Sequence, residues 1–338
     1  MRAVVLERHG GPDVLRVSEV PEAALGEGQV QVRLEAIGVN YAEVLSRRGY
    51  YGWAPPLPYV LGMEGAGVID AVGPGVAGRS PGERVIVGTK HGAYAELVVV
   101  PARQALPALS GFSMEENAAF GVNWLTAWVS LMEMARLRPG DSVLVTAAAG
   151  GVGTAAVQLA SRLGCTVIAM AGGEVKLERT RALGAVAGID YRQPGYEQKL
   201  KDAVGPAGVD VVLELVGGDV HRAVWPVLAP FGRVVVAGYA SLRLQRWNPL
   251  TWWRTWRDLP RADVRWLGRG SHGLMATHLG YLLKDAPRLA RVWEELGEFT
   301  ARHQLRPIID RVLPLAEVAE AHRLLESRGT IGKVLLRT

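Results

Sequence analysis

The chain is predicted to be an α/β protein with two domains, a compact β-rich domain and a doubly wound parallel-sheet domain. Its 338 residues exceed the length that one hydrophobic core usually supports. Residues 1–115 alternate short apolar runs with Gly/Pro turns, which is typical of small barrels and sandwiches. From Asp141 onward, strand patterns alternate with helix patterns, which indicates a parallel sheet covered by helices on both faces.

The N-terminal part is expected to hold short strands and few helices. Strands are predicted over residues 3–6, 14–17, 29–39, 65–72, 83–87 and 94–100. A short helix over 40–48 precedes a loop rich in Tyr, Gly and Pro at 49–58. Ser113, three residues before Glu116, has the pattern of a helix capping box and marks the change from strand patterns to helix patterns.

The C-terminal part continues the β/α alternation, and its last residues are expected to join the N-terminal domain. Strands are predicted over 143–146, 166–170, 186–189, 209–215 and 233–237, with helices over 152–163, 174–183, 195–204 and 220–228. Two amphipathic helices, 286–303 and 315–327, and a strand at 333–337 close the chain. This tail is too short for a domain of its own, so we expect residues 1–115 and 265–338 to form one domain and 116–264 the other.

Composition excludes several classes of protein. The net charge of +5 is mild for this length and argues against a nucleic-acid partner. One cysteine, Cys165, rules out a disulfide framework and is expected to be an inert core thiol. The first ten residues lack the apolar segment of a signal peptide, and glycines interrupt the uncharged stretch 142–161, so a cytoplasmic protein is expected.

A glycine turn joins an expected strand and helix within residues 141–163. Gly150, Gly151 and Gly153 form the turn, with Ala148 where a G-x-G-x-x-G dinucleotide fingerprint usually has its first glycine. Gly150 would let the backbone approach a pyrophosphate, and Gly153 would let the helix pack closely on the sheet. The helix N-terminus would offer free N–H groups to the phosphates. The turn is interpreted as a dinucleotide site; the alternative is a βα turn without a ligand.

The end of the next strand bears on the choice between NAD and NADP. An NAD site usually places a carboxylate there to bind the ribose hydroxyls. This strand instead ends in Ala171, Gly172 and Gly173, and Glu174 comes slightly late. Lys176 follows at helical spacing and suits a 2′-phosphate, which favours NADPH; the alternative is an ordinary solvated lysine on a helix.

Residues 241–270 are rich in tryptophan and arginine. Trp247, Trp252, Trp253, Trp256 and Trp266 lie in this segment. Aromatic and basic side chains together suit phosphate-rich partners or membrane headgroups. Tryptophan is also typical of interface cores, so an interface element is the favoured interpretation.

Motifs spread over nearly the whole chain carry a family resemblance. They are Gly38-Val39-Asn40, Gly62-Met63-Glu64-Gly65-Ala66-Gly67, Gly92-Ala93-Tyr94-Ala95-Glu96, Leu125-Thr126-Ala127, residues 147–153 and Ile331-Gly332-Lys333-Val334. The chain resembles the zinc-free quinone oxidoreductase branch of the medium-chain dehydrogenase/reductase superfamily, most of all its synaptic vesicle membrane protein-like subgroup. The resemblance implies a GroES-like β-barrel domain plus a Rossmann doubly wound parallel-sheet domain.

The resemblance also implies that no metal is bound. Zinc members of the superfamily use an early cysteine and the histidine of a Gly-His-Glu motif, where this chain has Asn40 nearby and Met63. His91 is interpreted as a loop histidine. Without a Lewis acid, the hydride acceptor must already be electrophilic, such as a quinone or a conjugated carbonyl.

Further residues take roles from the resemblance. Tyr51 and Asn40 match positions near the nicotinamide or substrate; Tyr51 would donate its phenol proton to a developing oxyanion, or would only form an aromatic lid. Leu45 and Asn123 differ from residues of some members, so no substrate preference is carried over. The cofactor positions implied are Asn40, Thr126, Ala149, Gly150, Gly151, Val152, Gly153, Gly172, Gly173, Lys176, Tyr191, Val216, Gly217, Gly238, Tyr239 and Arg328.

The sequence thus predicts an NADPH-dependent, zinc-independent reductase of quinones or related conjugated carbonyls. An alkenal or enoyl reductase is the enzymatic alternative, because the same site serves conjugate reduction. A cofactor-binding protein associated with lipid or membrane, with little activity, is the alternative from another class. The resemblance implies a homodimer.

Overall fold

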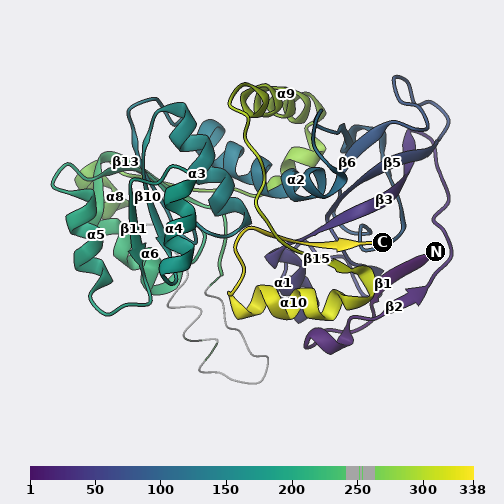
Figure 1. The fold of residues 1–338 in the computed structure, drawn as a ribbon, viewed down its shortest axis with the longest axis horizontal. Coiled ribbons are helices and arrows are strands. Elements are labelled where there is room, and N and C mark those ends of the chain that lie inside the picture. The colour runs from purple at the N-terminus through teal and green to yellow at the C-terminus, as the bar shows by residue number, and fades with distance from the viewer. Residues whose placement is uncertain (241–250, 252, 254–262) are drawn as a thin grey trace. The chain divides into compact units, whose positions relative to one another are not determined.

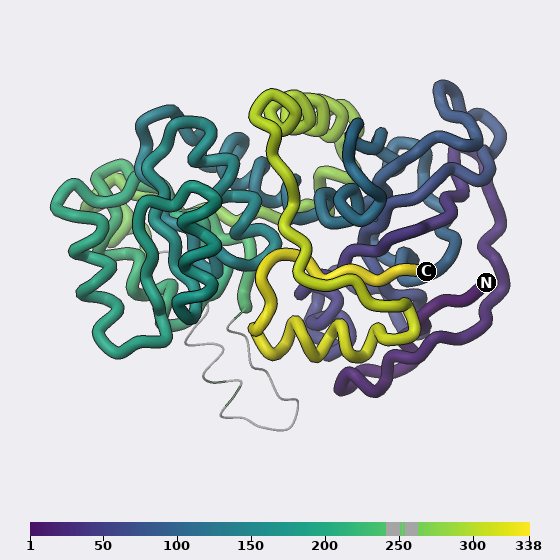
Figure 2. The backbone as a smooth tube through the Cα atoms, viewed as in Figure 1, coloured from purple at the N-terminus to yellow at the C-terminus, as the bar shows by residue number. Residues whose placement is uncertain are grey.

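The computed structural model describes residues 1–240, 251, 253 and 263–338. The chain divides into two compact units, Met1–Leu125 with Leu279–Thr338 and Thr126–His278. Figures 1 and 2 show the elements of both. The first unit has two sheets and the second has one, and each unit has its own hydrophobic core.

The first unit is built on β-strands, as predicted. Its larger sheet has the order β15-β16-β3-β5-β6-β8, with β7 paired to β3. A smaller sheet has the order β2-β1-β4. Residues along β3 alternate in burial, with Val32 and Leu34 inside and Arg33 and Glu35 exposed, so the strand faces the core on one side. The strands are β1 (Arg2–Leu6), β2 (Val17–Glu19), β3 (Gln29–Val39), β4 (Tyr59–Val60), β5 (Glu64–Val72), β6 (Arg84–Gly88), β7 (Leu97–Pro101), β8 (Ala105–Pro107), β15 (Ile309–Pro314) and β16 (Lys333–Arg337).

The expected strand at 14–17 is wrong. Pro12–Val14 form a 3₁₀ turn and β2 begins only at Val17. Proline at the start of this segment sets φ for a turn and removes a backbone donor that a strand would need.

Four helices accompany these strands. They are α1 (Tyr41–Arg48), α2 (Met114–Trp128), α9 (Ala286–Arg302) and α10 (Val318–Ser327). The capping box predicted at the start of α2 is confirmed, since Ser113 N donates to Glu116 Oε2 at 2.8 Å and Glu116 N donates to Ser113 Oγ at 3.1 Å. The C-terminal strand β16 pairs antiparallel with β3, so the tail packs on the first unit.

The second unit is a six-stranded sheet with the order β11-β10-β9-β12-β13-β14. All of its strand pairs are parallel. The strands are β9 (Ser142–Val145), β10 (Thr166–Ala171), β11 (Ala187–Asp190), β12 (Val209–Glu214), β13 (Leu228–Val236) and β14 (Gly273–Ala276). The helices include α3 (Gly151–Leu163), α4 (Glu174–Ala182), α5 (Tyr196–Val204), α6 (Gly218–Val224) and α8 (Val264–Gly270). The order reverses between β9 and β12, where ligands of doubly wound sheets bind.

The unit boundaries differ from the expected domain boundaries at 115/116 and 264/265. The second unit runs from Thr126 to His278. Residues 273–276 belong to it because β14 extends the parallel sheet beside β13. No strand is predicted over 273–276 from the sequence, although β14 is as long as β9 and β11, which are predicted.

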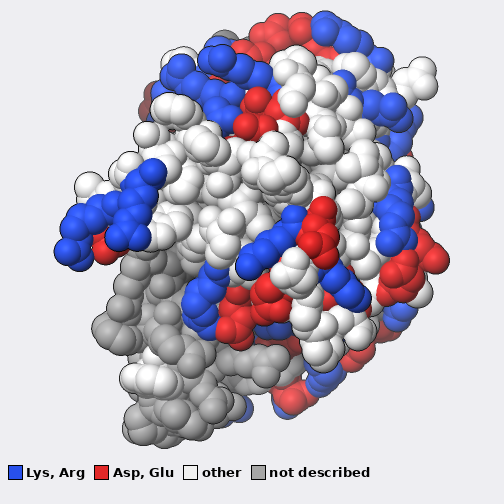
Figure 3. Space-filling view, turned by 90° about the vertical axis from the view of Figure 1, so that its left-hand side faces the viewer, with Lys and Arg blue, Asp and Glu red and all other residues white. Residues whose placement is uncertain are grey.

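Most of the Trp/Arg-rich segment lies outside the described residues, so the two interpretations of it stay open. Trp266, in the described α8, packs edge-on against Trp225 with ring centroids 4.5 Å apart. In the described part of the chain, no helix is both long enough and apolar enough to cross a membrane. On the face drawn in Figure 3, Lys and Arg side chains are interspersed with Asp and Glu side chains.

Candidate functional site

The glycine turn of the second unit connects β9 to α3. Ala147 has φ 45° and its carbonyl accepts from Gly150 N at 2.9 Å, which closes the turn. A Cβ at Gly153 would collide with the Ala147 carbonyl and the Ala148 backbone, so only glycine lets the helix start this close to the strand. Gly150 is the N-cap of α3 and no side chain caps the helix. The first N–H groups of α3 are therefore suited to an anion.

The tips of β10 and β11 bring several predicted residues together. The strands pair in parallel, with Ala171 beside Asp190, and Tyr191 N donates to Ala171 O at 3.3 Å. Tyr191 packs on the core of the sheet. Gly172, Gly173 and Lys176 follow β10 directly, and Lys176 is half-buried. Glu174, the carboxylate nearest in sequence, pairs with Arg181 at 2.5 Å.

Arg192 also belongs to this group, and sequence reasoning missed it. Its guanidinium lies over Gly172, where an added Cβ would collide with Nε. Its backbone N donates to Asp190 Oδ1 at 3.0 Å, which turns the chain at the end of β11. A basic residue three positions after the expected strand 186–189 was the available signal. Two cations, Lys176 and Arg192, thus follow neighbouring strand tips.

Beyond the point where the strand order reverses, the ends of β12 and β13 meet. Val216 and Gly217 follow β12, and Gly238 and Tyr239 follow β13. Ala240 N donates to Leu215 O at 3.2 Å, and a Cβ at Gly238 would lie 3.0 Å from the same carbonyl oxygen. These four predicted residues therefore line neighbouring strand ends.

The other predicted residues lie at separate places. Ala149 is buried within the glycine turn, with Gly151 and Val152 opening α3. Thr126 lies in α2 and is buried. Arg328 belongs to the first unit, as the C-cap of α10 with φ 56°.

In the first unit, the side chain of Asn40 sits in a buried charged cluster. Asn40 Nδ2 donates to Glu64 Oε1 at 2.9 Å and to Glu43 Oε1 at 3.3 Å. Lys333 Nζ donates to Asn40 Oδ1 at 2.6 Å and to Glu64 Oε1 at 2.5 Å. Val122 N donates to Glu64 Oε2 at 2.6 Å. Both amide hydrogens of Asn40 are used within the cluster, and its Oδ1 accepts from Lys333.

Glu43 ties this cluster to the start of α1. Its carboxylate accepts from Asn40 N at 2.7 Å and from Met63 N at 3.0 Å, in a capping box. Complete burial raises the pKa of Glu43 from 4.5 to about 7, although the charge of Lys333 opposes this. Sequence reasoning did not place Glu43, Glu64 or Lys333 in the site. The signals were the position of Glu43, three residues after an Asn N-cap, and the two quoted family motifs that contain Glu64 and Lys333.

Tyr51 lies on the loop after α1. Burial, and then the charge of Glu43, raise the pKa of Tyr51 to about 12. A phenol with this pKa stays protonated at neutral pH and can donate a hydrogen bond to an oxyanion. On the same loop, Trp53 packs edge-on against Tyr281 with centroids 5.0 Å apart.

The expectations of no bound metal and of an unreactive cysteine concern His91 and Cys165. Among the residues that the structure describes, no three His, Cys, Asp or Glu side chains are grouped so as to hold a metal ion. Burial lowers the pKa of His91, which lies in a loop. Cys165 is half-buried and not part of the core, but burial raises the pKa of its thiol to about 11.

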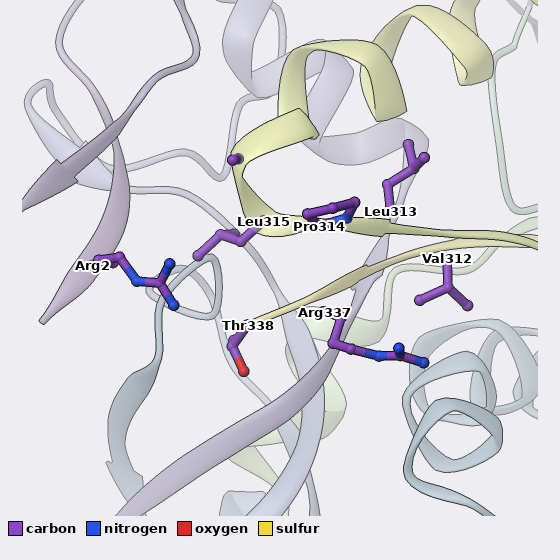
Figure 4. Close-up of a pocket in the computed structure, with 8 residues that line it drawn as sticks. Arg2, Val312, Leu313, Pro314, Leu315, Arg337 and Thr338 are labelled. Atoms are coloured by element: carbon purple, nitrogen blue, oxygen red, sulfur yellow. The ribbon is translucent and has the colours of Figure 1, made fainter.

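A pocket of about 250 Å³ in the first unit contains none of the predicted residues. Figure 4 shows its lining, with Arg2 and Arg337 beside the ends of β15 and β16. Both arginines are engaged, Arg2 Nε with Glu96 at 2.6 Å and Arg337 Nη2 with Glu115 at 2.6 Å. Each arginine of the pocket is therefore already paired with a carboxylate.

Family models match two parts of the chain. An alcohol dehydrogenase GroES-like domain matches residues 26–110, and a zinc-binding dehydrogenase domain matches residues 183–336. Both matched stretches reach into the first unit, and the second also covers much of the parallel sheet.

Similar proteins span nearly the whole chain. The synaptic vesicle membrane protein VAT-1 homolog of Rattus norvegicus is 37% identical over 339 residues, covering 99% of this chain and 84% of that protein. The quinone oxidoreductase of the same species is 31% identical and covers 99% of this chain and 97% of its own. The crystal structure of Escherichia coli quinone oxidoreductase complexed with NADPH has a TM-score of 0.89 at 30% identity and covers both chains completely.

Proposed function

Because this chain belongs to the medium-chain dehydrogenase/reductase superfamily, close to VAT-1 homologues and quinone oxidoreductases, we propose that it is an NADPH-dependent reductase of quinones or related conjugated carbonyls. The observations that carry the proposal are the pair of cations after β10 and β11 and, after the neighbouring strand β9, a helix N-terminus that no side chain caps.

The α3 N-terminus would hold the pyrophosphate. Gly153 leaves room where any side chain would meet the Ala147 carbonyl. The N–H groups of Gly151 and Val152 point out of the first turn, and helix dipoles favour negative charge there. The residues present therefore fit a dinucleotide.

The tips of β10 and β11 would bind the adenosine 2′-phosphate. Lys176 and Arg192 supply two positive charges, and Tyr191 directly precedes Arg192 at the end of β11. Glu174, which could compete by binding ribose hydroxyls as in an NAD site, is turned to Arg181. This arrangement favours NADPH over NADH.

Tyr51 would assist the acceptor. NADPH supplies a hydride when bound, and an electron-poor quinone or enone accepts it with negative charge passing to its carbonyl oxygen. Tyr51 holds its proton and would donate it, or a hydrogen bond, to that oxygen. Asn40 would keep the start of α1 in place through the cluster with Lys333, and a contact of its Oδ1 with the nicotinamide amide would have to replace one of the partners it has there.

Two further functions have specific support. Reduction of alkenals or enoyl compounds uses the same donor and the same phenol. A lipid- or membrane-associated role is suggested by the name of the VAT-1 homolog and by the exposed Trp253. Flotation with liposomes, with and without a Trp253→Ala change, tests that role, and no flotation in either case removes it.

The decisive experiment is stopped-flow oxidation of NADPH by a panel of quinones and enals. We expect single-turnover oxidation with at least one quinone and a lower Kd for NADPH than for NADH. Failure with every acceptor would overturn the reductase proposal, and equal affinity for the two cofactors would overturn the role of Lys176 and Arg192. A homodimer in the cytoplasm is part of the proposal, and light scattering of the purified protein tests the dimer.

A further inference from the structure

A buried carboxyl group joins the two strands at which the sheet order reverses. Thr146 follows β9 and Glu214 ends β12, and these strands are neighbours. Thr146 Oγ1 donates to Glu214 Oε1 at 3.1 Å and accepts from Leu215 N at 2.8 Å. Both side chains are completely buried. Glu214 is therefore buried at the end of β12, beside the point of strand-order reversal where ligands of doubly wound sheets bind.

The same oxygen shapes the turn that follows β12. Glu214 Oε1 accepts from Val216 N at 2.6 Å and from Gly217 N at 2.9 Å. Gly217 and Gly218 have φ of 81° and 61°, a conformation that the two hydrogen bonds help to hold. One carboxyl oxygen of Glu214 thus fixes the backbone conformation of the turn that follows β12.

The other oxygen of Glu214 faces a histidine. Glu214 Oε2 and His221 Nδ1 lie 3.6 Å apart, and neither has a hydrogen-bond partner among the described residues. Trp225 Nε1 donates to His221 Nε2 at 3.0 Å, so the neutral ring carries its hydrogen on Nδ1, toward Glu214. Trp225 in turn packs on Trp266. His221, whose ring is held by Trp225, therefore faces the second oxygen of the Glu214 carboxyl group across 3.6 Å.

We propose that Glu214, oriented by His221, is a positioning residue that shapes the Val216–Gly217 turn to receive the nicotinamide half of the cofactor. The inference rests on the proposed function. The direction follows from topology, because Lys176 and Arg192 on the β10–β11 side suit the adenosine phosphate. The strand ends across the reversal point, β12 and β13, are then left for the other half.

Glutamine at this position would keep the size of the side chain but change one contact. Its oxygen can still accept from Val216 and Gly217, whereas its NH₂ would face the Nδ1–H of His221. Two donors then oppose each other in a buried place, and the turn or the histidine must move. The loss of binding free energy is therefore expected only for the half of the cofactor that contacts the turn after β12.

The test compares Glu214→Gln with Asp210→Asn, a matched control on the same strand. Asp210 also ties β12 to β9, accepting from Ser142 Oγ at 2.8 Å, but at the opposite end of the strands. The ligands are NADPH and 2′,5′-ADP, which contains only the adenosine end. We expect Glu214→Gln to raise the Kd of NADPH by about ten- to one-hundred-fold while the Kd of 2′,5′-ADP changes less than about two-fold. Asp210→Asn should change neither Kd by more than about two-fold.

Equal weakening of both ligands, an unchanged Kd of NADPH, or the same pattern from Asp210→Asn would overturn the inference. If Glu214→Gln does not fold, His221→Asn serves instead, with the same split expected at about three-fold or more. A wild-type protein that binds neither ligand would overturn the proposed function itself, which is a different result.

Discussion

The ammonium group of Lys333 lies 2.5 Å from Glu64 Oε1 and joins the last strand of the chain to β5. Both side chains are almost completely buried. The same nitrogen donates to Asn40, so the first residue before α1 depends on a strand that lies close to the C-terminus.

Lys333→Met should strongly destabilise the first unit. The change leaves Glu64 and Glu43 buried without their cation, and losing one partner of a buried ion pair costs about 3–5 kcal/mol. Urea unfolding followed by circular dichroism measures the loss. Lys284→Met, which removes an exposed lysine near Trp53, should cost less than about 1 kcal/mol. The double variant Glu64→Gln/Lys333→Met should recover part of the stability, and equal costs for the two lysines would contradict this account of the cluster.

Glu43 should make the protein less stable as pH rises from about 4.5 to about 7. The folded state binds the proton more tightly, because the pKa of Glu43 is about 7 there, whereas an exposed glutamate in the unfolded chain has a pKa of 4.5. Between these values the unfolded chain has lost the proton and the folded one has not, so the free energy of unfolding falls with pH, by up to about 3 kcal/mol. Above about pH 7 both states are ionised and this contribution no longer changes.

The measurement for Glu43 is the free energy of unfolding of wild type and Glu43→Gln at several pH values. The wild type should lose stability relative to the variant over that window. Glu35→Gln, on the exposed side of β3, is the control and should follow the wild type. Parallel curves for wild type and Glu43→Gln would show that Glu43 does not titrate in this range.

Arg192→Gln should weaken NADPH binding by about ten-fold and leave NADH binding unchanged. The lost guanidinium would otherwise form charge-assisted hydrogen bonds to the 2′-phosphate. Arg179→Gln, on the exposed face of α4, is a matched control that should affect neither cofactor. Fluorescence titration gives both Kd values, and an equal loss for NADH would mean that Arg192 only supports the fold.

Tyr51→Phe should lower kcat for a quinone by about one-hundred-fold, because the variant lacks the phenol that would donate to the carbonyl oxygen of the acceptor. The Kd of NADPH should change little. The pKa of about 12 keeps the phenol protonated, so Tyr51 itself should cause no loss of rate between about pH 7 and pH 10. Tyr281→Phe, an exposed tyrosine of the same unit, is the control. Steady-state kinetics over this pH range tests both points, and an active Tyr51→Phe would leave the ring as no more than a lid.

Local patterns were sufficient for most of the fold. The β/α alternation after Asp141, the turn at Gly150–Gly153 and the capping box at Ser113 each depend on residues close together in sequence. Strands and helices of this kind are set by periodicity, glycine and capping side chains, so they can be recognised without knowing what packs on them. The shortness of the C-terminal tail placed it with the first unit, and the family resemblance added the types of the two domains.

The site depends far more on pairing between distant segments. Arg192 reaches Gly172 only because β11 pairs with β10, and Glu214 gains its role only because β12 lies beside β9. Sequence spacing does not indicate which strands become neighbours.

The sequence by itself therefore determined the two domain types, the glycine turn and the candidate residues that lie on it. Only the tertiary structure decided that Asn40 is also held by Glu64 and Lys333, with Lys333 293 residues away from Asn40. The physical reason is burial: a carboxylate or an amide that is ordinary in water must find partners once the fold excludes water from it. Which partners it finds is a property of the packed chain.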